Sequence, residues 1–196
     1  MKYFLSIILV CVSISATAQH HYKGVGGIEV NVGSRLTGEA FNIESNVFLS
    51  KYINYNSYYK IGLNYFVTDL EIPGQVERSK AYNYHLAGKY SYTIAAFPHI
   101  VSATDIFFNL QGGAFMGIEH LSGLGKYRDP GNIPYVHFSD YRRNTFVLGP
   151  TVTAELEVFI SKRVAILLNV SEYWTPLSKV EKWHTTATAG IKFLMY

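Results

Sequence analysis

Apolar and polar residues alternate along most of the chain with a period of two. In the first such stretch, Ile28, Val30 and Val32 fall on one face, while Glu29 and Asn31 fall on the other. A period of two is typical of a β-strand with two different faces, whereas an amphipathic helix repeats every three to four residues. The pattern recurs in eight stretches, residues 27–35, 40–51, 58–69, 81–94, 106–120, 143–160, 164–173 and 183–196.

The predicted strands are long and even in number. Strands in ordinary globular proteins average about five or six residues, while a membrane-spanning strand needs about 9–11 residues, which most of these stretches reach. Antiparallel strands of this length can close into a barrel that leaves no strand edge unpaired in lipid. The sequence therefore predicts an all-β fold, an eight-stranded antiparallel up-and-down outer-membrane β-barrel.

The connections between the predicted strands alternate between short and long. Residues 53–56 and 161–162 are tight turns. The longer and more polar connections are residues 73–80, 122–141 and 174–182. Short periplasmic turns and longer extracellular loops are typical of outer-membrane barrels. Residues 95–105 are the exception, because the alternation places this connection on the periplasmic side although it is long for a turn.

A soluble β-sandwich would show the same alternation, with its apolar face buried instead of facing lipid. Strand length, aromatic placement and the C-terminal sequence favour the barrel, because Tyr and Trp side chains prefer lipid–water interfaces. The aromatic residues near the predicted periplasmic ends are Tyr52, Tyr55, Tyr58, Tyr59, Tyr90, Tyr92 and Phe97. Those near the opposite ends are Tyr82, Tyr141, Tyr173, Trp174 and Trp183.

The end of the chain resembles the signal that the outer-membrane assembly machinery reads. Thr188 and Gly190 are followed by the alternating apolar residues Phe193 and Met195. Tyr196 is one trailing residue beyond the common form of this signal. We expect Thr188, Gly190, Phe193 and Met195 to act as the assembly signal.

The first residues have the form of a secretory signal peptide. A positive charge at Lys2 precedes an apolar run and the small-residue sequence Ala16-Thr17-Ala18. This pattern predicts a signal peptide over residues 1–18, cleavage between Ala18 and Gln19, and a mature barrel domain over residues 19–196. The apolar run is shorter than the ~20 residues of a membrane-spanning helix.

Composition and charge narrow the function classes. The single cysteine, Cys11, lies within the apolar run without the context of a lipoprotein signal, so the mature chain has no cysteine for disulfides or thiolate metal sites. The sequence holds 16 Tyr, 12 Phe and 16 Gly with only 16% charged residues, which suits aromatic-rich strands and flexible turns. A formal net charge of +3 is too small and scattered to indicate nucleic-acid binding.

Charged residues recur on the polar face of the predicted strands. In a barrel of eight strands this face fills a narrow interior, and buried charges must be paired. We therefore predict an interior charge network made of Glu29, Glu44, Lys60, Lys89, Glu119, Glu155, Glu157, Arg163 and Lys192. Glu155 and Glu157, two residues apart, could instead be read as a glycosidase pair. The network explains them without a substrate cleft.

No catalytic, metal or cofactor motif accompanies these charges. The histidines of the mature chain lack metal-ligand spacing, and the sequence contains no G-x-S-x-G, H-E-x-x-H or phosphate-binding loop. We therefore predict a protein that is not an enzyme and that has no cofactor and no small-molecule substrate. Because side chains fill an eight-stranded barrel, any function should lie on the loops or the outer wall.

Several short segments resemble one known family. They are GIEV at residues 27–30 with Gly33, T-x-E-x-EVFIS at 153–161, RV at 163–164, LLNV at 167–170, HT at 184–185 and GIKF at 190–193. In this order they resemble the TraO family, proteins of the conjugative transposons of Bacteroides-type bacteria. The resemblance is strongest over residues 152–193 and thin over residues 70–121.

The resemblance implies an outer-membrane component of the conjugal transfer apparatus that moves DNA between cells. The implied partners are outer-membrane lipid and other conjugal transfer proteins, with no direct contact to nucleic acid. The family provides no catalytic residues. Two alternatives stay open: a general small barrel acting through its loops in adhesion or envelope defence, and a barrel enzyme acting on lipids through Glu155 or a histidine.

The longest loop, residues 122–141, is the candidate contact surface for a partner protein. It and the residue after it combine positive charge with aromatic rings, a mixture that suits a protein interface. The candidate partner residues are Lys126, Tyr127, Arg128, Tyr135, Tyr141 and Arg142. A passive, solvated loop is the alternative.

Overall fold

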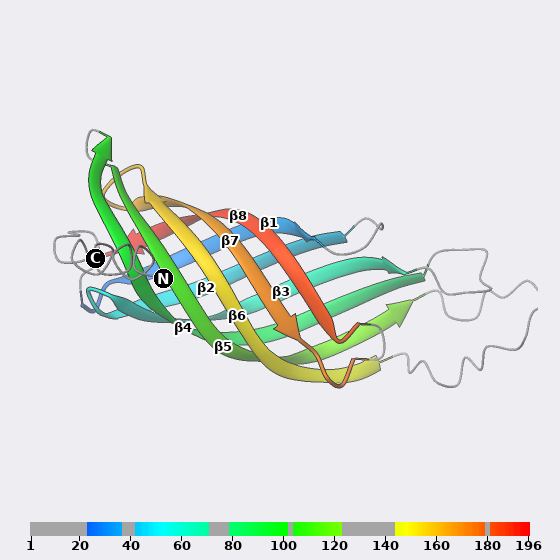
Figure 1. Cartoon of the computed structure of the whole chain (residues 1–196). Helices are drawn as coiled ribbons and strands as arrows, with labels where there is room; N and C mark the ends of the chain where they lie inside the picture. Colours follow the sequence, from blue (N-terminus) through cyan, green and yellow to red (C-terminus); the bar gives the residue numbers. More distant parts are fainter. Residues whose placement is uncertain (1–22, 37–41, 71–78, 102–103, 123–143, 179–180) are drawn as a thin grey trace, which may run out of the picture.

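The computed structural model describes residues 23–36, 42–70, 79–101, 104–122, 144–178 and 181–196. Eight strands form one closed antiparallel barrel, in which each strand pairs with its sequence neighbours and β1 pairs with β8 (Figure 1). The strands are β1 (Gly26–Arg35), β2 (Asn42–Asn54), β3 (Ser57–Leu70), β4 (Ser79–Val101), β5 (Thr104–Ser122), β6 (Asn144–Phe159), β7 (Val164–Trp174) and β8 (Trp183–Met195). The predicted fold is confirmed.

The two ends of the barrel differ in their connections. At one end, here called the turn end, short turns join β2 to β3 and β6 to β7, and the C-terminus lies there too. The N-terminal part of the described chain is fixed at the same end, because the Gly24 amide donates to the Tyr52 carbonyl at 2.8 Å. The longer connections leave from the opposite end, here called the loop end (right in Figure 1).

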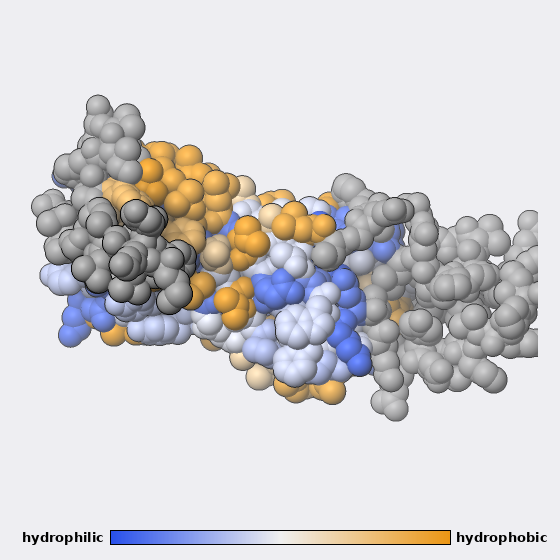
Figure 2. All heavy atoms as spheres, viewed as in Figure 1, coloured by the Kyte–Doolittle hydropathy of each residue, from blue (hydrophilic) through white to orange (hydrophobic). Residues whose placement is uncertain are grey.

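The two faces of the wall follow the alternation in the sequence. Val32 is 57% exposed on the outside, while its neighbour Asn31 is 2% exposed on the inside. The same inversion runs through the other strands, so aliphatic and aromatic side chains cover the outer wall and most inward side chains are polar. A soluble sandwich would bury its apolar face instead. Figure 2 shows orange, apolar side chains gathered on the wall nearer the turn end, with paler and blue ones nearer the loop end.

The prediction of a long connection over residues 95–105 is wrong. β4 runs for 23 residues and β5 for 19, and their pairing continues to Val101 and Thr104. The β3–β4 ladder ends with Ser57 opposite Tyr92, so the hairpin projects past the rest of the wall at the turn end (Figure 1). Register shifts between Thr93 and Ala95 and between Phe97 and Val101 interrupt the alternation there. The period-two pattern therefore does not predict a strand over these residues.

The predicted aromatic girdles are correct only in part. Tyr55, Tyr59, Tyr90 and Tyr92 are about half exposed on the outside near the turn end, and the stacked rings of Trp174 and Trp183 lie outside near the loop end. Three tyrosines expected at the interfaces point inward instead and are fully buried, namely Tyr52, Tyr58 and Tyr173. They occupy inward positions of the period-two pattern, which outweighs the preference of tyrosine for an interface. Tyr141 lies outside the described residues.

Candidate functional site

Five charged side chains meet in the turn-end half of the barrel interior. They come from four strands: Glu29 of β1, Lys60 of β3, Glu155 and Glu157 of β6, and Lys192 of β8. None is more than 3% exposed. Period-two alternation turns each of them inward, and closure of the barrel then brings strands that are distant in sequence within ion-pair distance.

Lys192 is the centre of this network. Its Nζ lies 3.0 Å from Glu157 Oε1, 3.2 Å from Glu29 Oε1 and 3.9 Å from Glu155 Oε1. The ammonium also lies over the Tyr58 ring, 4.3 Å from its centroid. A single lysine therefore faces three carboxylates, and its removal would leave these negative charges close together in a medium of low dielectric.

Lys60 completes the pairing from the opposite side. Its Nζ lies 2.8 Å from Glu29 Oε2 and 3.0 Å from Glu155 Oε2. Glu29 and Glu155 each contact both lysines, so lysines and glutamates alternate around a closed ring. An unpaired buried charge costs several kcal/mol. The contacts around this ring give each of its buried charges two partners of opposite sign.

Neutral side chains satisfy the remaining carboxylate oxygens. The Tyr58 hydroxyl donates to Glu155, and the Tyr52 hydroxyl donates to Glu157 at 3.3 Å. The Asn109 amide nitrogen donates to both carboxylates, at 3.1 Å and 3.2 Å. Glu155 and Glu157 are thus both part of a buried ion-pair network whose other contacts come from lysine, tyrosine and amide side chains.

Polar groups toward the loop end are paired less completely. Lys89 forms no ion pair with any described residue: its Nζ donates to Thr153 Oγ1 at 2.8 Å and lies 5.4 Å from the centroid of the Phe48 ring. Glu44 accepts hydrogen bonds from Tyr173 at 3.3 Å and from Asn46 at 3.2 Å.

Five aromatic rings close the lumen beyond Lys89. Phe66, His85, Phe115, Tyr173 and His184 contact one another in a cycle, with ring centroids 4.6–5.6 Å apart. They come from five strands and are nearly fully buried. This aromatic layer was not predicted, although each member occupies an inward position of the alternation, which is the signal that could have found it.

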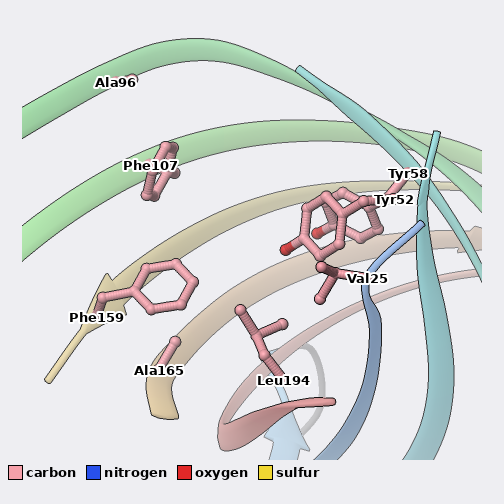
Figure 3. Packing of buried hydrophobic residues seen from close by; sticks show 8 residues of the cluster. All are labelled: Val25, Tyr52, Tyr58, Ala96, Phe107, Phe159, Ala165 and Leu194. Atoms are coloured by element: carbon pink, nitrogen blue, oxygen red, sulfur yellow. The ribbon is translucent and has the colours of Figure 1, made fainter. Parts of the chain in front are cut away.

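An apolar cluster closes the other side of the charge network, at the turn end. Phe107 and Phe159 meet edge to face with centroids 5.6 Å apart. Figure 3 shows them with the other members, Val25, Tyr52, Tyr58, Ala96, Ala165 and Leu194. Ala96 and Phe107 belong to the β4–β5 hairpin. The interior is thus filled in three layers, with apolar, charged and aromatic side chains following one another from the turn end.

Eight of the nine residues predicted for the interior charge network are buried inside the barrel, and Arg163 is not. Glu119 is inward and accepts a hydrogen bond from Ser178 at 2.8 Å. Arg163 is exposed in the turn between β6 and β7, with its guanidinium 5.9 Å from the centroid of the Tyr196 ring. Its expected place in the network is wrong, because the alternation of β6 cannot be extended through a turn.

The residues of the predicted assembly signal all lie on β8, which closes the barrel against β1. Thr188 faces inward, while Phe193 and Met195 are about half exposed on the outside. Gly190 pairs with Asn31, and a side chain at this position would overlap the Val30 carbonyl and the Asn31 amide. Glycine is therefore required where the two ends of the sheet meet.

The other predicted sites are not described by the structure. The cleavage site at Ala18 and Gln19 lies outside the described residues, as do Lys126, Tyr127, Arg128, Tyr135, Tyr141 and Arg142. Within the described part of the chain, no group of three or more His, Cys, Asp or Glu side chains is placed to hold a metal ion. In the same part, no helix has the length and hydrophobicity to cross a membrane.

Comparison with known proteins gives one family and several structural neighbours. The family model described as conjugative transposon protein TraO matches residues 24–195, nearly the whole described chain. Comparison with curated proteins gives no match.

The similar solved structures are small barrels. The N-terminal β-barrel domain of Pseudomonas aeruginosa OprF aligns with a TM-score of 0.53 at 9% identity, covering 88% of this chain and 98% of that domain. Ail of Yersinia pestis aligns with a TM-score of 0.47 at 13% identity, covering 88% of this chain and 99% of that one. At these identities the likeness concerns the fold alone.

Proposed function

The chain belongs to the TraO family of conjugative transposon proteins, and from this premise we propose that it is an outer-membrane component of a conjugal transfer apparatus. Its role there is structural: the barrel anchors the apparatus in the outer membrane and contacts other transfer proteins. The observation that carries the proposal is the family match over residues 24–195, combined with an outer wall of exposed apolar side chains.

The filled interior supports a structural role over a role in transport. The charge network lies between the apolar cluster and the aromatic layer, and eight strands leave room for little more than their own side chains. We therefore propose that no substrate passes through the lumen and that the protein is not an enzyme. DNA would cross the envelope elsewhere in the apparatus, with this barrel as a fixed point beside it.

The proposal includes the route to the membrane and its orientation. Residues 1–18 would direct export and be removed after Ala18, and β8 would then be read by the assembly machinery. By the rule that turns are periplasmic and loops extracellular, the turn end faces the periplasm. Residues 122–141 would then face outward, where they can contact another transfer protein.

Mating assays test this function. Deletion of the gene from its mobile element should lower transfer frequency without affecting growth, and the wild-type gene should restore transfer. Normal transfer from the deletion strain would refute the conjugation role and favour a general small barrel.

A second strain tests the loop. Replacement of residues 122–141 by a short Gly-Ser turn should lower transfer while the barrel still inserts. Unboiled and boiled samples that migrate differently on a denaturing gel would show that the shortened barrel is folded. Full transfer by this folded variant would mean that the loop is passive.

A further inference from the structure

The outer wall carries a depression of about 730 Å³ in the loop-end half of the barrel. Three successive residues from each of four neighbouring strands line it, at 45–47, 63–65, 84–86 and 116–118, together with His120 and Asn144. The proposed function does not use this site, which lies on the opposite side of the wall from the lumen.

One row of inward-facing residues lies behind the depression. Asn46, Asn64, His85 and Gly117 are paired with one another across β2 to β5 and form one row. A side chain at Gly117 would overlap the Tyr84 carbonyl oxygen and approach the His85 ring, so only glycine allows this spacing of β4 and β5. This close approach of β4 and β5 at Gly117 forms part of the lining of the depression.

The outward side chains change character along the barrel axis. Nearest the middle of the wall, Val47, Leu63, Leu86 and Met116 are paired in one aliphatic row. The next row toward the loop end contains Tyr65 and Tyr84, whose ring centroids are 5.1 Å apart.

The lining residues nearest the loop end, His120 and Asn144, are polar, although their row continues into Tyr82, Val67 and Ile43. His120 Nδ1 lies 2.7 Å from Asn144 Oδ1, a contact that does not use the Asn144 amide hydrogens. Two residue pairs further toward the loop end, Lys80 is opposite Ser122, and its half-exposed ammonium lies 3.9 Å from Asp69. The lining itself contains no charged side chain.

We propose that this depression binds a single phosphate-bearing lipid of the leaflet at the loop end. One acyl chain lies against the aliphatic row, and the headgroup reaches His120, Asn144 and Lys80. The proposal rests on the proposed function only in requiring that the barrel spans a membrane. An acyl chain adapts to a shallow hollow, and the lining changes from the aliphatic row to His120 and Asn144 in the order of a lipid from its tail to its headgroup.

The test uses the mature chain folded into bilayers of phosphatidylethanolamine and phosphatidylglycerol, then extracted in mild detergent and measured by native mass spectrometry. Leu86→Trp fills the aliphatic part of the hollow. Leu148→Trp is the matched control, because Leu148 pairs with Met116 in the same row, is 45% exposed like Leu86, and does not line the depression. His120→Phe keeps the ring but removes the polar atoms.

The wild type and Leu148→Trp should each retain one lipid. Leu86→Trp should retain about tenfold less, the effect of losing contact with roughly two methylene groups. His120→Phe should lower retention of phosphatidylglycerol and phosphatidylethanolamine alike. All four proteins should show the same heat-modifiable migration, which separates lipid loss from misfolding.

Two results would overturn the proposal: a wild type that carries no lipid, or equal retention by Leu86→Trp and Leu148→Trp. A barrel that binds no lipid but photo-crosslinks from position 86 to another membrane protein would assign the depression to a protein segment instead. Neither result would bear on the proposed conjugation role, because that role is tested separately by the mating assays.

Discussion

The turn-end and loop-end halves of the barrel interior fill the same narrow space with different chemistry. In the turn-end half, Glu29, Glu155 and Glu157 are all within 4 Å of a lysine Nζ. In the loop-end half, His85 and His184 are buried, yet none of their four ring nitrogens has a hydrogen-bond partner among the residues that the structure describes. The charges of the turn-end half form one network of ion pairs, whereas the histidines of the loop-end half act as packed aromatic rings, beside a separate ion pair between Arg35 and Glu181.

This difference shows that the alternation predicts which side chains face inward but does not predict whether they form ion pairs or pack as rings. A buried charge is costly to leave unpaired, so each member of the network depends strongly on its partners. A ring that contributes only packing can be exchanged for another ring of similar volume at little cost. Substitutions in the two halves should therefore have very different effects on the free energy of unfolding.

The largest effect is expected for Lys192→Met. The substitution keeps most of the side-chain volume but leaves Glu29, Glu155 and Glu157 with one lysine among them, and loss of one partner of a buried pair costs about 3–5 kcal/mol. Urea unfolding of the mature barrel in detergent would show a much lower midpoint. Lys182→Met, at an exposed position near the loop end, is the control and should unfold like the wild type. Equal midpoints would mean that the carboxylates are hydrated.

A smaller effect is expected for Lys89→Met, although Lys89, like Lys192, is buried inside the barrel. Its hydrogen bond to Thr153 and its contact with the Phe48 ring are lost, but no carboxylate within ion-pair distance is left behind. Loss of a hydrogen bond from a charged donor suggests about 1–2 kcal/mol, measured in the same urea titration. A loss as large as that of Lys192→Met would show that Lys89 neutralises Glu44 over a longer distance.

A still smaller effect is expected for His85→Phe in the aromatic layer. Its imidazole forms no hydrogen bond with any part of the chain that the structure describes, and it stacks on Phe115 with centroids 4.6 Å apart. Another aromatic ring of similar size should change the free energy of unfolding by less than about 1.5 kcal/mol. His85→Ala should destabilise the barrel more, because it removes the stacked ring. If His85→Phe were as damaging as His85→Ala, the imidazole nitrogens would have partners, such as ordered water.

The fold could be predicted from the sequence because a period of two is compatible with few folds when the strands are long and even in number. Eight strands with apolar outer faces cannot stay open in lipid, so closure and the inward charges followed from counting alone. The extension of the β4–β5 hairpin into residues 95–105 was missed because register shifts near Thr93 and Phe97 interrupt the alternation. A bulge depends on the pairing between strands, which a single sequence does not display.

The composition of the interior was harder to predict than its location. Tyr52, Tyr58 and Tyr173 were assigned to interfaces by residue type, although their positions in the alternation turn them inward. Which lysine meets which glutamate depends on the cross-strand register and on closure of β8 against β1, neither of which the pattern specifies. In such a barrel, the position of a residue in the alternation is therefore a better guide than its type to whether its side chain faces inward. Which side chains contact one another depends on the cross-strand register.

The smallest effect is expected for Arg163→Ala. Period-two counting placed this arginine with the interior charges, but it lies in the turn between β6 and β7, where its charge is exposed to solvent. Its guanidinium is 5.9 Å from the centroid of the Tyr196 ring, and exposed contacts of this kind contribute little. The urea midpoint should therefore correspond to a change within about 0.5 kcal/mol. A loss comparable to that of Lys192→Met would place Arg163 inside the barrel and move the turn into β6. Agreement with the wild type would show that the ion-pair network ends where the strand ends.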